Sequence, residues 1–250
     1  MIMAMTMIIP TPIRIPTAMI DTSQVMFRLM TWLSPAFPVG AFSYSHGLEW
    51  AAEAGLVFDK TTLESWITAG LRHEFGPLNG SILRAAWEAT MARDANGFAE
   101  ALADARALVP TAEFELETMA QGGAFFSTLS KITRGSECFD WVQKHIAFEP
   151  GPVPYPFVVG CLAASADAPL PLALTAYFQS VVGNLVSSGL RLISLGQTAG
   201  QDIVASLEGA VMAVTQDVLT RAPCDVGVAA PMIEWSSMCH ETQYTRLFRS

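Results

Sequence analysis

A rigid turn leads into a short helix at Ser34-Pro-Ala-Phe-Pro-Val-Gly-Ala-Phe-Ser-Tyr-Ser-His-Gly-Leu-Glu-Trp50. Pro35 and Pro38 push the residues before them out of helical geometry and remove two backbone donors. The hydroxyls of Ser43 and Ser45 then stand where the start of a helix favours a capping acceptor. This stretch therefore predicts an extended or turned aromatic loop that packs against another surface, followed by a short helix.

The rest of the chain shows apolar residues at helical spacing almost throughout. One series begins after a capping group at Asp59, Thr61 or Thr62 and continues to Phe75. Similar patterns predict helices over 82–96, 98–108, 114–132, 139–146, 155–166, 172–195 and 198–220. No stretch alternates with a two-residue period between turn signals, which is the pattern expected of strands. We therefore predict an all-α, single-domain helical bundle of roughly eight to ten helices.

The two ends of the chain differ from this pattern. Residues 1–24 are apolar but interrupted by prolines, and we expect a flexible N-terminal extension. Residues 25–221 form the predicted all-α domain, and residues 222–250 a C-terminal tail that is non-helical or partly helical. Because the tail carries aromatic residues, it should dock either on the body or on another protein. The residues alone leave both possibilities open.

The composition restricts the class of protein. Hydrophobic residues make up 51% of the chain and charged residues only 15%, so a part of the apolar surface should be covered by an oligomer, a partner or a membrane. The net charge of −9 makes nucleic acid an unsuitable partner. The four cysteines are far apart and match no paired spacing, which indicates reduced thiols in a cytoplasmic protein.

A membrane span is an alternative for residues 170–190, which carry no charge. Prolines interrupt the start of this segment, and polar residues recur along one face from Ser180 to Arg191. An amphipathic, mostly buried helix of the bundle explains that pattern better than a membrane helix.

Three blocks of this sequence resemble the UreF family of urease accessory proteins. They are the stretch from Ser34 to Trp50, the segments Ser187–Arg191 and Leu195–Gln201, and the terminal block Ser236–Ser250. The resemblance implies a homodimeric helical protein that is not an enzyme and needs no cofactor. It also implies that the protein works with the accessory protein UreD (UreH) and the GTPase UreG to deliver nickel to apo-urease.

The same resemblance implies a partner-binding surface on the loop, on the late helix junction and on the tail. Its expected residues are Pro35, Phe37, Pro38, Phe42, Ser43, Tyr44, His46, Glu49, Arg191, Gln197, Gln201, His240, Glu241, Tyr244, Arg246, Leu247, Phe248 and Arg249. Within this set, we expect Tyr44 to contribute more to binding than to stability, and the tail arginines to dock on the GTPase or reach into its site.

A helical hydrolase or ligand-binding protein is the alternative function, with Ser43, His46 and Glu49 as its site. The glycines around Ser43 do not have the spacing of a nucleophile elbow, so capping is the favoured role of this serine. The four histidines are isolated in the sequence, and we assign no metal ligands.

Overall fold

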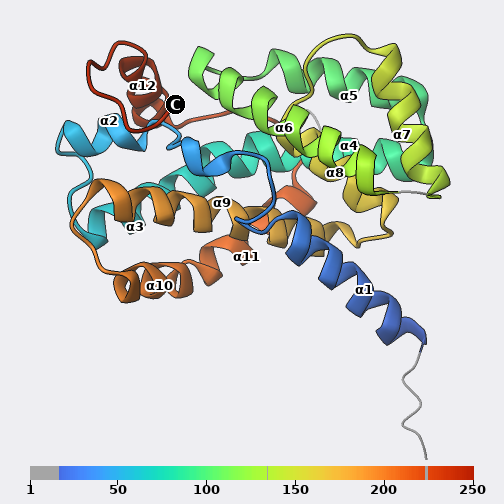
Figure 1. The fold of residues 1–250 in the computed structure, drawn as a ribbon, viewed down its shortest axis with the longest axis horizontal. Coiled ribbons are helices and arrows are strands. Elements are labelled where there is room, and N and C mark those ends of the chain that lie inside the picture. The colour runs from blue at the N-terminus through green and yellow to red at the C-terminus, as the bar shows by residue number, and fades with distance from the viewer. Residues whose placement is uncertain (1–16, 134, 223–224) are drawn as a thin grey trace, which may run out of the picture.

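The computed structural model describes residues 17–133, 135–222 and 225–250, and these ranges contain helices and loops but no strand (Figure 1). The elements are α1 (Thr17–Trp32), the 3₁₀-helix η1 (Ala41–Ser43), α2 (Leu48–Glu53), α3 (Lys60–Gly70), the π-helix η2 (Leu71–Gly80), α4 (Ser81–Ala92), α5 (Ala95–Ala107), α6 (Ala112–Ile132), α7 (Glu137–Phe148), α8 (Tyr155–Ser165), α9 (Leu170–Leu192), α10 (Gln197–Ser206), α11 (Glu208–Thr220) and α12 (Pro231–His240). The predicted all-α fold is confirmed.

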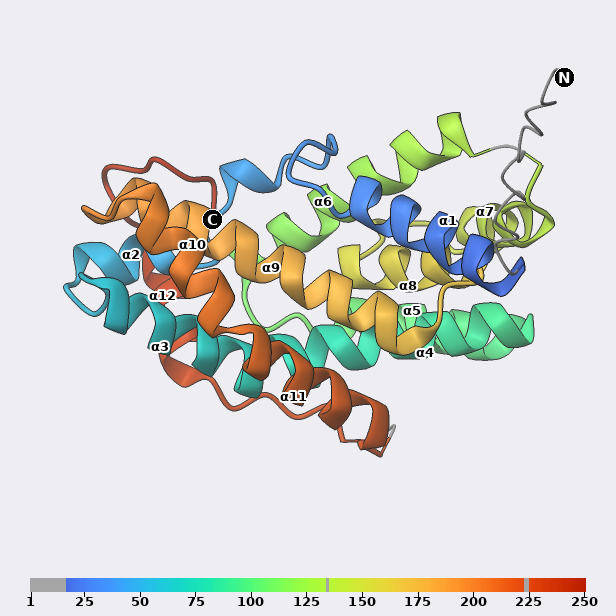
Figure 2. The same ribbon diagram turned by 90° about the horizontal axis from the view of Figure 1, so that it is seen from below.

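Two apolar helices form the centre of the bundle. Every residue of α8 from Pro156 to Ala164 is buried, and α8 packs against α4, α6, α7 and α9. At Gly160 the backbones of α8 and α4 come so close that an added Cβ atom would lie 2.3 Å from the carbonyl oxygen of Leu83. Helix α9 runs along the molecule and contacts elements from both halves of the chain (Figure 2).

The segment from α3 to α4 is continuous but not regular. Of the three capping groups that the sequence offered, Asp59 caps α3, and its carboxylate and the Thr62 side chain form the reciprocal bonds of a capping box. The sequence did not predict the next element, the π-helix η2, which contains Pro77. Wide helical turns of this kind are rare in proteins, and those that occur are often found at functional sites. Here the π-helix carries Glu74, which is 2% exposed.

The helix predicted over 198–220 is two helices, because the chain turns at Leu207 between α10 and α11. By length and composition, the segments Leu170–Leu192 and Gln197–Thr220 could each cross a membrane. Core helices pass the same test. In α9, the side chains of Tyr177, Phe178 and Val182 are all buried in the bundle, so this helix is part of the protein core.

Of the two predicted ends of the domain, the N-terminal one needs adjustment, and the tail agrees with its prediction. Helix α1 begins at Thr17, so the expected boundary at residue 24 falls inside a helix, while residues 1–16 lie outside the described ranges. The tail is partly helical: α12 packs on α2 and α6, and residues 241–250 follow it in a non-helical return (Figure 1).

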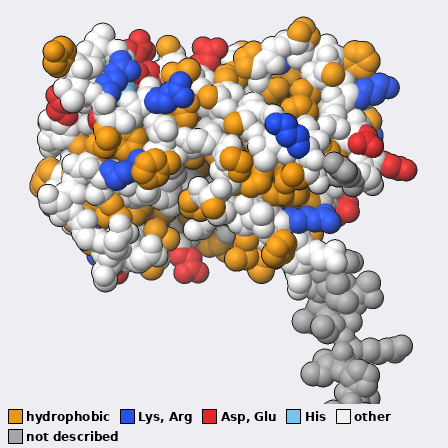
Figure 3. All heavy atoms as spheres, viewed as in Figure 1, with side chains coloured by type: hydrophobic (Ala, Val, Ile, Leu, Met, Phe, Trp, Pro, Cys, Tyr) orange, Lys and Arg blue, Asp and Glu red, His pale blue; other side chains and the backbone are white. Residues whose placement is uncertain are grey.

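Exposed apolar side chains agree with the low content of charged residues. Figure 3 shows hydrophobic side chains distributed over the face seen in Figure 1, with few charged groups between them. Large exposed side chains lie on α1, on α12 and in the tail: Met26, Phe27, Met30, Met232, Trp235, Met238, Tyr244 and Leu247.

Candidate functional site

The loop before α2 is held by its own backbone and by the tail. Gly40 and Gly47 adopt positive φ angles of 77° and 74°, which glycine tolerates best. A Cβ atom at Gly47 would lie 2.9 Å from the backbone nitrogen of Ser237, so α12 packs directly on this glycine. The N-cap residue of α2 is Gly47 rather than one of the predicted serines, although the Ser45 hydroxyl accepts the Glu49 N–H in the first turn at 3.2 Å.

The last residues of the tail run beside this loop and are bonded to it through the main chain. The Arg249 N–H donates to the Ser43 carbonyl at 2.8 Å, and the Ser45 N–H donates to the Ser250 carbonyl at 2.8 Å. The Ser45 hydroxyl donates to the same carbonyl at 2.7 Å. Loop and tail therefore form one structural unit, although about 200 residues separate them in the sequence.

A buried carboxylate connects this unit to α12. Glu49 accepts the Leu247 N–H at 2.6 Å and the Phe248 N–H at 2.9 Å. Its Oε2 lies 3.0 Å from Nε2 of His240, whose side chain is fully buried. The second ring nitrogen of His240 lies 2.5 Å from Glu113 of α6, which also pairs with Arg246 at 3.0 Å.

A second histidine lies between two carboxylates nearby. His46 Nε2 is 3.1 Å from Glu74, and His46 Nδ1 is 3.3 Å from Glu117. Burial alone would lower the pKa of His46, but the two carboxylates outweigh it and raise the pKa to about 10. The ring stacks on Phe114 with centroids 3.7 Å apart, and the Ser250 hydroxyl donates to Glu117 at 2.8 Å.

Arg191, near the end of α9, lies between two aromatic rings. Its guanidinium is 3.7 Å from the ring centroid of Phe42 and 4.3 Å from that of Phe248. It also donates to the Phe42 carbonyl at 2.7 Å and to the Ser188 hydroxyl at 3.1 Å. Desolvation lowers the pKa of Arg191 from its ordinary value. One arginine thus binds loop, helix and tail together.

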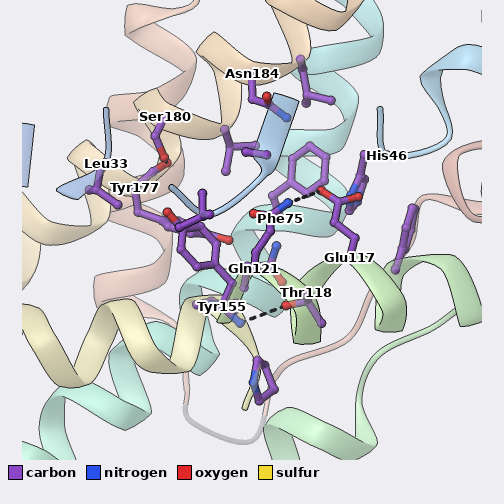
Figure 4. A pocket seen from close by; sticks show the side chains of 18 of the residues that line it. Leu33, His46, Phe75, Glu117, Thr118, Gln121, Tyr155, Tyr177, Ser180 and Asn184 are labelled. Atoms are coloured by element: carbon purple, nitrogen blue, oxygen red, sulfur yellow. Dashed lines mark hydrogen bonds and ion pairs between the residues drawn. The ribbon is translucent and has the colours of Figure 1, made fainter. Parts of the chain in front are cut away.

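A pocket of about 190 Å³ lies between the loop, η2, α6 and α9. Figure 4 shows His46 and Glu117 toward one side of the pocket and Tyr177 and Ser180 toward the other, with Asn184 between the two sides. Pro35 and Phe42, which are exposed, also line it, so the pocket reaches the surface beside the loop.

Comparison of the sequence with known proteins places this chain in a family. The UreF family model matches residues 57–208, which is more than half of the chain. The chain is 44% identical to the urease accessory protein UreF of Rhodopseudomonas palustris strain BisB5, over 92% of this chain and 93% of that protein. It is also 44% identical to the protein of that name from Azorhizobium caulinodans, over 89% and 94%.

The chain belongs to the UreF family. The resemblance inferred from three blocks of sequence is therefore confirmed. The family model itself does not include the loop at 34–50 or the tail, whereas the alignment with the first relative extends over 230 residues.

Within this UreF chain, the expected partner-binding residues fall into three groups by exposure. The exposed residues are Pro35, Pro38, Phe42, Gln197, Gln201, Glu241, Tyr244, Arg246, Leu247 and Arg249. The half-buried ones are Ser43, His46 and Arg191. The buried ones are Phe37, Tyr44, Glu49, His240 and Phe248. In this conformation the buried five do not form a contact surface; they position the exposed residues around them.

The structure corrects one further expectation. Tyr44 is 2% exposed, so its main contribution is to the core rather than to a surface. The tail arginines are both exposed: Arg246 pairs with Glu113 and bonds the Glu241 carbonyl, Arg249 lies 5.9 Å from the Tyr44 ring, and their role toward the GTPase stays a prediction. Of the two possibilities for the tail, this structure has it docked on the body.

Sequence reasoning missed the carboxylates of Glu74, Glu113 and Glu117. Glutamates are common on helix surfaces, and nothing in the sequence marks the buried Glu74 and Glu113 or the half-buried Glu117 as partners of histidines. The only available signal was the spacing of Glu113 and Glu117, which places both on one face of α6.

The alternative hydrolase site is not assembled. His46 contacts Glu74 and Glu117, and Glu49 contacts His240 and the tail, so Ser43, His46 and Glu49 belong to separate contacts. Among the described residues, no group of three or more His, Cys, Asp or Glu side chains is arranged to hold a metal ion.

Proposed function

We propose that this UreF-family chain is a cytoplasmic, non-enzymatic urease accessory protein that assembles with UreD (UreH) and the GTPase UreG on apo-urease. In this complex it recruits the GTPase, gates its activity and helps to deliver nickel, the cargo of the complex, to the urease. The observation that supports this most directly is the 44% identity to urease accessory proteins over 92% of the chain.

The unit formed by loop and tail is the surface proposed for partner binding. Its exposed side chains, led by Tyr244 and Leu247, project from a backbone that Glu49 and Arg191 fix in place. Tyr244 is fully exposed and Leu247 is 64% exposed, although both are large and apolar. Tyrosine in particular is enriched at the centre of protein interfaces. The chain is also expected to form a homodimer.

The experiment is light-scattering size-exclusion chromatography of the full chain, alone and mixed with UreD and UreG. We expect a dimer that shifts into a larger complex, and we expect the double variant Tyr244→Ala, Leu247→Ala to lose the shift while its helix content stays unchanged. The control is Met212→Ala on α11, which also removes an exposed apolar side chain. A wild-type chain that elutes unchanged with both partners would contradict the proposal.

A further inference from the structure

The pocket beside His46 has the composition of a cation site. Its walls include the aromatic rings of Phe42, Phe75, Phe114, Tyr155 and Tyr177. Its lining also includes amide and hydroxyl groups of Asn79, Gln121, Ser180 and Asn184, the carboxylates of Glu74 and Glu117 and the ring of His46, but no lysine or arginine. Aromatic faces and carboxylates both attract positive charge.

The charges at this pocket do not balance within the described part of the chain. Both ring nitrogens of His46 face carboxylate oxygens, so the ring supplies one positive charge between Glu74 and Glu117. Glu117 receives further bonds from Gln121 at 3.0 Å and from Ser250 at 2.8 Å. The single positive charge of His46 therefore faces two carboxylates, those of Glu74 and Glu117.

Of the two carboxylates, Glu74 has the fewer partners for its oxygens. Its Oε1 lies 3.1 Å from His46, whereas its Oε2 is buried and has no hydrogen-bond partner among the described residues. Burial raises the pKa of Glu74, which indicates that its charge is poorly compensated. A buried carboxylate oxygen without a donor is costly, and a ligand that supplies an N–H group would remove that cost.

We propose that this pocket binds an alkylammonium or guanidinium group, with its N–H donors directed to Glu74 and its alkyl part against the aromatic walls. A volume of about 190 Å³ is several times the ~30 Å³ share of one water molecule, so the pocket has room for such a group. The group comes either from a free small molecule or from a lysine or arginine side chain of another protein. This site does not depend on the function proposed above.

Calorimetric titration of the purified full chain with methylguanidinium chloride tests the proposal, with sodium chloride at matched ionic strength as the reference. We expect saturable binding of one cation per chain. Glu74→Gln should weaken this binding at least tenfold. Glu115→Gln removes an exposed carboxylate of α6 that does not line the pocket, and it should leave the affinity unchanged.

A second pair of variants keeps the test valid if Glu74→Gln fails to fold. Gly183 lines the pocket on α9, and a Cβ atom there would meet nothing within 4 Å. Gly183→Leu should therefore fill the pocket and abolish binding without disturbing the fold. Gly209→Leu on α11, where a Cβ atom also has open space, should bind as the wild type does.

The source of the cation is distinguished by a second probe, N-acetyl-arginine N-methylamide. Binding at least as tight as that of methylguanidinium indicates a side chain of a partner protein, and binding of methylguanidinium alone indicates a free small cation. The proposal is overturned if neither probe binds, if sodium chloride at matched ionic strength gives the same signal as methylguanidinium chloride, or if Glu74→Gln and Gly183→Leu both leave the affinity unchanged.

Discussion

Two glutamates of α6 hold two different histidines from positions four residues apart. Glu113 pairs with His240 of α12, and Glu117 pairs with His46 of the loop. Four carboxylates and two imidazoles thus connect segments that are up to about 200 residues apart in the sequence. The residue types could be seen in the sequence, but their pairing could not, because it depends on which turns of which helices face each other.

His46 should make stability depend on pH. Its pKa is about 10 in the folded protein against 6.5 in an unfolded chain, so its contribution is fully present below pH 6.5 and is lost as the pH rises to about 10. The free energy of unfolding should fall over this window by up to about 1.4 kcal/mol per pH unit. Urea denaturation at several pH values measures it.

His46→Gln should flatten this dependence, whereas the exposed His73→Gln should keep it. A wild-type chain whose stability is constant from pH 6.5 to 10 would show that the His46 cluster does not hold its charge in solution.

Tyr44 should contribute chiefly to stability. Because its ring is buried, Tyr44→Ala should lower the free energy of unfolding by about 3–5 kcal/mol. Tyr244→Ala makes the same chemical change at a fully exposed position and should cost less than about 0.5 kcal/mol. Denaturant titration of both variants decides this, and equal losses would contradict the assigned burial.

At the scale of the elements, the pattern of apolar residues located most helices correctly but not their irregular joins. A cap at Asp59, Thr61 or Thr62 could be predicted because capping is a local interaction between residues close in sequence, and the structure selects Asp59. The π-helix at Leu71–Gly80 could not, because apolar residues of α3 and η2 continue at helical spacing through the wider turns. The break at Leu207 was missed for the same reason.

Two adjacent glycines, Gly122 and Gly123, lie on α6, and the structure distinguishes the two residues. A Cβ atom at Gly122 would lie 1.9 Å from the carbonyl oxygen of Val153, in the connector before α8, whereas one at Gly123 would meet nothing within 4 Å. Gly122→Ala must therefore displace backbone.

We expect Gly122→Ala to destabilise the protein by more than about 2 kcal/mol, because overpacking against backbone leaves no side chain that can move aside. Gly123→Ala should be neutral or stabilising by up to about 1 kcal/mol, since alanine favours the helix. Thermal melts of the two variants provide the comparison, and a reversed order would show that α6 and the connector are farther apart.

At the scale of the whole molecule, the sequence predicted the family and the fold class, and it identified loop and tail as special. It could not decide whether the tail covers the body or meets a partner, since aromatic residues favour both. The structure has residues 241–250 docked, with Phe248 buried and Tyr244 exposed on the same short segment. The tail can therefore cover the core with some side chains and present others to a partner.

Removal of residues 241–250 should destabilise the body as well as affect binding. The truncated chain loses Phe248 from the core and the two N–H donors of Glu49, which stays in place beside His240. A buried carboxylate that loses donors typically costs several kcal/mol, so we expect the free energy of unfolding to fall by about 3–5 kcal/mol. Amide exchange at Ser45, whose N–H now bonds Ser250, should become faster.

The full-length double variant Tyr244→Ala, Leu247→Ala is the matched control, because it removes exposed side chains and leaves these backbone bonds in place. Its stability should stay within about 0.5 kcal/mol of the wild type. Comparison of the two proteins separates the stabilising role of the tail from its role in binding. If the truncated chain were as stable as the full-length one, the docked tail would add nothing to the fold. Its buried contacts with Glu49 and Arg191 would then not persist in solution.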